Sequence, residues 1–250
     1  MSRCERQFLT EVAPKIVVGV DGCPGGWFAI ASTGQMGVYR SFQELLGKDL
    51  LGRDEAATYL IDIPIGLPNA APRDLEFQAR RLLTGKSSSV FAVPCRDAVY
   101  AENYQQACHI NQERFGKKLS VQSWNICGKI REVDKALRDS PALSLHIYES
   151  HPELAFQQLI GEPLLFSKKT RDGLEERLQI LQRFIPDARA WYAAALTAHP
   201  RKRLARDDIT DAMVLMWVGK SAQFCLVDGQ VQDEHKVPIR MLIPQKGAFS

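Results

Sequence analysis

Short apolar runs separated by turn residues fill the first part of the chain and predict a sheet. Three strands are expected, at residues 16–20, 27–32 and 36–39. Ser41 suits the N-cap of a short helix that runs through Leu46. A fourth, apolar strand is expected at 59–63 and ends at Pro64, because proline cannot donate a hydrogen bond to a sheet ladder. This order of elements indicates a mixed sheet whose fourth strand lies beside the first.

The middle of the chain changes to a helical pattern. Residues 73–137 predict helices broken by loops, so we expect a helical insertion at about residues 70–142, after the fourth strand. The remaining elements are expected as a strand at 143–148, helices from Pro152 and at 173–184, 188–197 and 209–224, and a last strand at 237–243. The chain, residues 1–250, is therefore predicted to be a single α/β domain with a mixed sheet flanked by helices.

Several carboxylates stand among apolar residues. Asp21 ends the first strand, Asp62 lies within YLIDIPIGLP, and Glu149 ends the strand before residue 150. Asp208 and Asp211 open the last helix, three residues apart and therefore on one face. Burying an ionised carboxylate costs several kcal/mol unless a cation or several donors compensate it. If the strands are neighbours, these acids converge, and each pair about 4 Å apart repels by roughly 4 kcal/mol at an effective dielectric of 20.

A divalent cation would compensate this repulsion. Oxygen ligands alone favour Mg²⁺ or Mn²⁺ over zinc. The expected ligands are Asp21, Asp62, Asp208 and Asp211. Two ions about 3.5–4 Å apart would suit in-line displacement at phosphorus. Glu149 would be a further ligand or would orient the attacking water.

Each of these residues also has a structural alternative. Asp21 is equally suited to capping its glycine-rich turn. For an acid at the start of the last helix, the alternative is that it serves as an N-cap and has no further role. The structural alternative for Asp62 is a buried ion pair with an arginine, either Arg73 or Arg96. His151 is a candidate general acid or metal-side ligand, and a neutral histidine held by a backbone partner is an equal alternative.

Basic residues near the acids supply candidate phosphate contacts. These are Lys168 and Lys169 in the SKKT stretch, and Arg206 immediately before the acidic start of the last helix. The segment LTGKS at 83–87 is not a P-loop, because the first glycine of that motif would fall at Arg80. The glycines at 19–26 do not give G-x-G-x-x-G, so a dinucleotide site is not expected.

Composition narrows the class of protein. The 32 Lys and Arg against 29 Asp and Glu give a net charge of +3, too small to indicate a nucleic-acid binder by itself. The six cysteines are scattered singly, which indicates reduced thiols rather than a disulfide scaffold or a zinc site. No apolar run is long enough for a membrane span and no signal peptide is present, so a cytoplasmic protein without a membrane partner is expected.

The order of GVDGCPGGW, IDIPIGLP, SSVFAVP, KIREVD, ESHPE, SKKT and DDITDA resembles the domain-of-unknown-function 429 family. This family is described as predicted nucleases of RNase H-like fold. The resemblance implies a catalytic acid on the first strand, matching Asp21, a second on the fourth strand, matching Asp62, and a further acid or pair on the final helix, matching Asp208 and Asp211. It also implies that Glu149 and His151, in ESHPE, line the same cleft.

The resulting hypothesis is a divalent-metal-dependent nuclease or phosphodiesterase with a two-metal carboxylate site. Its partner would be nucleic acid or a nucleotide-like substrate. Two alternatives stay open: a nucleotide-binding phosphotransferase of the actin and sugar-kinase kind, and a non-catalytic RNase H-like binding module. The first would be stabilised by ATP, and the second would bind without turnover.

Overall fold

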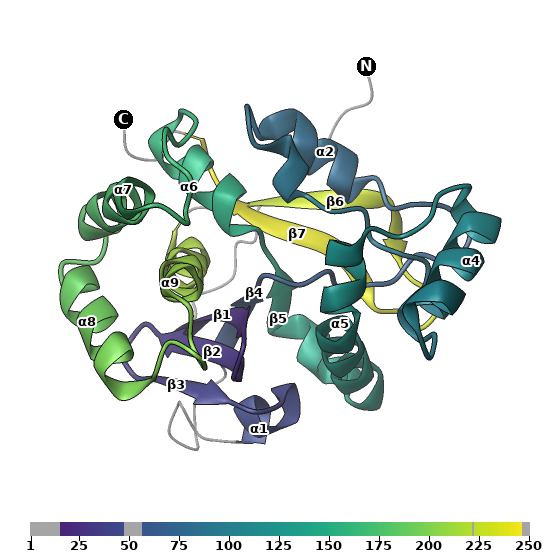
Figure 1. Cartoon of the computed structure of the whole chain (residues 1–250), viewed down its shortest axis with the longest axis horizontal. Coiled ribbons are helices and arrows are strands. Elements are labelled where there is room, and N and C mark those ends of the chain that lie inside the picture. Colours follow the sequence, from purple (N-terminus) through teal and green to yellow (C-terminus); the bar gives the residue numbers. More distant parts are fainter. Residues whose placement is uncertain (1–15, 48–56, 222, 247–250) are drawn as a thin grey trace.

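A seven-stranded mixed sheet flanked by helices forms the core of the computed structural model, which describes residues 16–47, 57–221 and 223–246 (Figure 1). The strands are β1 (Ile16–Cys23), β2 (Gly26–Ala31), β3 (Met36–Tyr39), β4 (Ala57–Ile61), β5 (Ile147–Glu149), β6 (Gln223–Gln232) and β7 (Pro238–Pro244). The helices are α1 (Phe42–Gly47), α2 (Leu75–Leu82), α3 (Arg96–Val99), α4 (Tyr104–Phe115), α5 (Val121–Asp139), α6 (Pro152–Ile160), α7 (Arg171–Gln182), α8 (Ala188–Ala198) and α9 (Arg206–Lys220). Two short 3₁₀ helices span Ser87–Ser89 and Pro141–Leu145.

The strand order is β3-β2-β1-β4-β5-β7-β6. The first three strands form an antiparallel meander, and β4 and β5 continue the sheet parallel to β1. Strand β7 is parallel to β5, and β6 closes that edge antiparallel to β7. The prediction that the fourth strand lies beside the first is confirmed, and the topology is consistent with an RNase H-like α/β fold.

Three predicted boundaries are wrong. Strand β4 ends at Ile61, so Asp62 follows the strand instead of lying inside it. The segment expected as a strand at 143–148 begins as a 3₁₀ helix, and only Ile147–Glu149 pair with a neighbouring strand. The last helix ends at Lys220, and residues 223–224 belong to β6, which the sequence pattern did not predict. That strand exists through its pairing with β7, a contact that local periodicity cannot report.

The helices cover both faces of the sheet. Figure 1 shows α7, α8 and α9 on one side and α4 and α5 on the other. Alternate residues of β1 enter the two cores: Val17 packs with α9 residues such as Met213, and Val18 packs in the core that includes Ile130 of α5. Helices α2–α5 lie between β4 and β5 in the chain, where the insertion was expected; its limits at about residues 70–142 stay a prediction. In the described part of the chain, no helix is both long and apolar enough to cross a membrane.

Helix α9 lies directly on β1 because Gly19 has no side chain. A Cβ atom at Gly19 would overlap the carbonyl oxygen of Ala212 and the amide nitrogen of Met216. Both overlaps are with helix backbone, which cannot rotate away as a side chain can. Gly19 therefore sets how closely the start of α9 approaches the end of β1, where the acids lie.

Replacing Gly19 with alanine is expected to lower the free energy of unfolding by about 3 kcal/mol or more, because the helix must move off the sheet. Urea unfolding followed by circular dichroism measures this loss. The matched control is Gly128→Ala on α5, where an added Cβ would meet only the end of the Arg131 side chain, at 3.9 Å. The control should keep or slightly gain stability. If both variants unfold at the same urea concentration, the close approach of α9 to β1 is refuted.

Candidate metal centre

The carboxyl ends of β1 and β4 bring Asp21 and Asp62 to the same edge of the sheet. The parallel ladder pairs Val20 with Ile61, so the next residue on each strand lies beside the other. The amide of Asp62 donates to the carbonyl of Val20 at 3.2 Å, which continues the ladder by one bond. Asp21 has the same side-chain direction as Gly19 and therefore faces α9. Its side chain is buried.

The start of α9 adds Asp208 and Asp211. The Asp208 carboxylate accepts a hydrogen bond from the amide of Ala205 at 2.8 Å. Ala205 is the N-cap and Asp208 is the third helical residue, so Asp208 stabilises the start of α9 without being the N-cap that was considered. Asp211 lies one turn further along, with its side chain only 1% exposed. Burial raises the pKa of Asp21 well above its usual value, and the negative charges of Asp62, Asp211 and Asp208 raise it further. Four acids from three distant segments therefore lie within electrostatic reach of one another.

Lys168 provides a positive charge inside this cluster. Its Nζ lies 2.7 Å from an oxygen of Asp211 and 3.7 Å from an oxygen of Asp207. Burial would lower the pKa of Lys168, but the attraction of Asp211 and Asp21 outweighs burial and raises this pKa above its usual range. Lys168 was expected to contact phosphate; in this structure its ammonium group is the counter-ion of the acids.

The donor set suits a hard divalent cation. Oxygen Oδ1 of Asp211 is buried and has no hydrogen-bond partner among the described residues. Burial raises the pKa of both Asp208 and Asp211 to about 6, which indicates that their charge is incompletely compensated. Within residues 16–47, 57–221 and 223–246, no group of three or more His, Cys, Asp or Glu side chains is already arranged to hold a metal. The residues therefore fit Mg²⁺ or Mn²⁺ by their chemistry, and a metal would compete with Lys168 for Asp211.

Glu149 is held by an arginine. Its Oε1 accepts from Nη2 of Arg73 at 2.8 Å, and its Oε2 accepts from Nη1 at 2.9 Å and from the amide of Ile65 at 2.8 Å. Both oxygens are thus engaged in a buried pair, which does not support the expected role of Glu149 as a free ligand or water-orienting group. Arg73 was the alternative partner considered for Asp62; it binds Glu149 instead, and Arg96 binds other carboxylates.

His151 is the N-cap of α6. Its Nδ1 accepts from the amide of Leu154 at 3.3 Å, and its Nε2 lies 3.4 Å from the carbonyl oxygen of Ser89. An accepting Nδ1 leaves the proton on Nε2, so the neutral ring donates to Ser89. Burial raises the pKa of Asp62, and the positive charges of His151, when protonated, and of Lys168 oppose that rise. The contacts of His151 are therefore those of a neutral histidine held by backbone partners, which was the structural alternative. The ring still interacts with Asp62.

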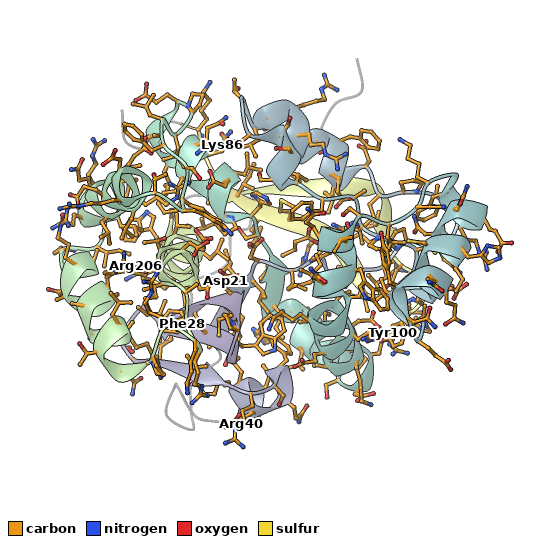
Figure 2. The ribbon with its side chains drawn as sticks, in the orientation of Figure 1. Asp21, Phe28, Arg40, Lys86, Tyr100 and Arg206 are labelled. Carbon is orange, nitrogen blue, oxygen red and sulfur yellow. The ribbon has the colours of Figure 1, made fainter. Side chains whose placement is uncertain are left out.

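A cavity of about 650 Å³ opens beside Asp62. Lys168, Lys169 and His151 line it. Figure 2 shows Asp21 near the centre of the molecule, at the end of β1. Arg206 is exposed at the start of α9 (Figure 2), and it is not among the described residues that line this cavity. The structure therefore brings the two lysines to the cavity beside Asp62, and leaves Arg206 outside it.

The sequence reasoning missed the segment that forms another wall of the cavity. Residues 85–91 follow α2 and carry Lys86 and Phe91, both of which line the cavity. Lys86 Nζ donates to the carbonyl of Phe166 at 3.0 Å and pairs with Glu153 at 3.3 Å, which joins this segment to the loop that carries Lys168. The SSVFAVP stretch was the available signal, because it belongs to the motif set and includes Phe91.

Residues 19–233 match the family described as Protein of unknown function (DUF429). The match covers well over half of the chain and includes every residue of the centre described above. No curated protein and no solved structure matches the chain.

Proposed function

The chain belongs to the family Protein of unknown function (DUF429), and we propose that it is a divalent-metal-dependent phosphodiesterase acting on nucleic acid or a nucleotide-like substrate. The observation that carries this proposal is that Asp21, Asp62 and Asp211 lie within electrostatic reach of one another, at the ends of two parallel strands and in the first turns of α9. Buried acids that repel one another cost stability in the absence of a cation, and such clusters are typical of functional sites. The cavity borders this cluster at Asp62 and Lys168, which both line it, and a substrate would reach the cluster from there.

The residues have distinct roles in this proposal. Asp21, Asp62 and Asp211 would hold Mg²⁺ or Mn²⁺, and Asp208 would fix the first turn of α9 through its hydrogen bond to the backbone. The metal, when bound, would activate water and stabilise the leaving oxygen. Lys168, once released from Asp211, would be free to contact a phosphate at the cavity.

Other groups would position these acids. Glu149 accepts the amide of Ile65 and so fixes the segment that carries Asp62 after β4. It is therefore a positioning residue in this proposal, together with Arg73. The Nε2–H of His151 would be a proton donor on the same cavity wall as Asp62, and Lys169 would supply a further positive charge at the cavity.

Mg²⁺ or Mn²⁺ is expected to raise the melting temperature of the purified protein, and to raise it more at about pH 7.5 than at about pH 5. The proposed ligand Asp211, with a pKa raised by burial to about 6, is largely protonated at the lower pH and cannot bind a cation well. Without metal, the stability of the folded protein itself depends on pH in the opposite direction, through Asp208 and Asp211. The folded acids hold protons that the unfolded chain releases above its ordinary pKa of 3.8, so stability falls as pH rises from about 4 to 6.

Thermal melts at both pH values, with and without metal, measure these shifts. Cleavage of bis(p-nitrophenyl) phosphate with metal, and its loss with a chelator, tests the activity. A protein that neither gains stability from metal nor cleaves a phosphodiester would refute the proposal. ATP-dependent stabilisation without cleavage would favour a phosphotransferase, and nucleic-acid binding without turnover would favour a non-catalytic module.

A cytoplasmic location belongs to the same proposal. Cys23, Cys95, Cys108 and Cys127 are free and buried, as expected for thiols in a reducing compartment. Cys4 lies outside the described residues, and Cys225 is in β6.

A further inference from the structure

We infer that the cavity beside Asp62 binds one nucleoside monophosphate unit, with the phosphate at the carboxylate centre and the base against Phe91; this rests on the function proposed above. The cavity of about 650 Å³ is the size of a site for one small ligand. A free nucleotide and the exposed end of a nucleic-acid strand both present this unit.

One part of the cavity is charged. Asp62, Lys168 and Lys169 line it there. The other charged lining residues are engaged in ion pairs: Glu76 and Glu149 with Arg73, and Glu153 with Lys86 and Arg177. Lys169 is exposed, and within the part of the chain that the structure describes its ammonium group forms no ion pair. Two lysines beside a cluster that would bind a cation complement a phosphate group, because the bound cation would remove the repulsion that the acids exert on an anion.

The wall of the cavity runs from this charged part to α5. The carbonyl of Ser89 lies at His151, and three residues later the carbonyl of Ala92 accepts from Ser123 Oγ of α5 at 3.3 Å. Three residues span at most about 10 Å. Phe91 lies on this segment, two residues after Ser89, so its Cα is within about 7 Å of the Cα of the residue whose carbonyl lies at His151. In a nucleoside monophosphate one sugar links the base to the phosphate, so the base could contact Phe91 while the phosphate lies at the charged part of the cavity.

Phe91 is available to a ligand. Val90 and Val93 on the same segment are each only 5% exposed, whereas Phe91 is 41% exposed and lines the cavity together with Ile126. A singly exposed aromatic residue is ordinary on a protein surface; one that lines a cavity next to two lysines offers a stacking surface for a planar base.

A side-chain contact bridges two of the segments that line the cavity. The bond from Lys86 to the carbonyl of Phe166 joins the segment after α2 to the loop before α7, across the residues that line the cavity (Figure 2 labels Lys86). The net charge of +3 gives little overall attraction for the long phosphate backbone of a duplex. The site is therefore suited to one nucleotide rather than to the interior of a duplex.

Isothermal titration with Mg²⁺ present tests this inference, using adenosine 5′-monophosphate and ribose 5-phosphate as probes, neither of which contains a diester. The nucleotide is expected to bind about 5- to 150-fold more tightly, since stacking of one base is worth about 1–3 kcal/mol. Phe91→Ala should remove that advantage, Phe91→Leu should keep part of it, and Phe77→Ala on α2, 56% exposed and outside the cavity, should keep all of it.

Equal affinity for the two probes, or an unchanged advantage in Phe91→Ala, would overturn the inference. Cleavage of bis(p-nitrophenyl) phosphate by the unmodified protein reports the proposed function separately, because that substrate has no base. Competition with linear and circular single-stranded DNA distinguishes the two sources: a strand end is the occupant if only the linear form displaces the nucleotide, and a free nucleotide is the occupant if neither does. Equal displacement by both forms would overturn the preference for a single unit.

Discussion

Asp62→Asn is expected to lower metal-dependent phosphodiester cleavage on the order of a thousandfold. The substitution keeps the shape of the side chain and removes the charge that faces both the cavity and the carboxylate centre. Loss of one metal ligand costs several kcal/mol of transition-state stabilisation. Each loss of about 1.36 kcal/mol lowers the rate about tenfold, so roughly three such steps give the expected thousandfold loss. Initial rates with Mn²⁺ and a phosphodiester substrate measure the change.

The matched control is Asp139→Asn, which removes an exposed carboxylate on α5 that pairs only with Lys135 in the described structure. This variant should cleave at the rate of the unmodified protein. Asp62→Asn should melt at the same temperature as the unmodified protein or higher, because burial raises the pKa of Asp62 and the charged form is therefore disfavoured in the fold. An Asp62→Asn protein that is folded and still cleaves at full rate would remove Asp62 from the mechanism.

Arg73→Met is expected to lower the free energy of unfolding by about 3–5 kcal/mol. The Arg73 side chain is completely buried, and it pairs with Glu76 and Glu149. It also donates to the carbonyl of Ile65 at 2.7 Å. Without the guanidinium group, two buried carboxylates would have no cation. Urea unfolding followed by circular dichroism measures the loss.

Two further variants make this test specific. Arg73→Met combined with Glu76→Gln and Glu149→Gln should recover most of the stability, because the unpaired charges are then removed as well. Arg189→Met removes an arginine whose pair with Glu175 is exposed, and this control should unfold at the urea concentration of the unmodified protein. If Arg73→Met were as stable as Arg189→Met, the buried ion pair would not contribute to the free energy of unfolding. Glu149 would then again be a candidate ligand of the metal centre.

The first strands illustrate what local pattern predicts well. Each of β1, β2 and β3 is a short apolar run ended by turn residues, and Ser41 caps α1 by accepting the amide of Glu44 at 3.1 Å. These features depend on neighbours in the chain, so the sequence contains them in full. Strand β6 is the opposite case. Its first residues continue the apolar run of α9, and only the pairing of Phe224 with Ile243 makes that stretch a strand.

The candidate site shows the same division. The sequence by itself determined which acids are out of place, at Asp21, Asp62 and the start of α9, because a carboxylate in an apolar run is visible without coordinates. Only the tertiary structure decided which cation each acid faces: Arg73 forms an ion pair with Glu149, and Lys168 forms one with Asp211. Ion pairs act through space over a few ångströms, and Arg73 and Glu149 are 76 positions apart in the chain, so no spacing along the sequence reports such a contact.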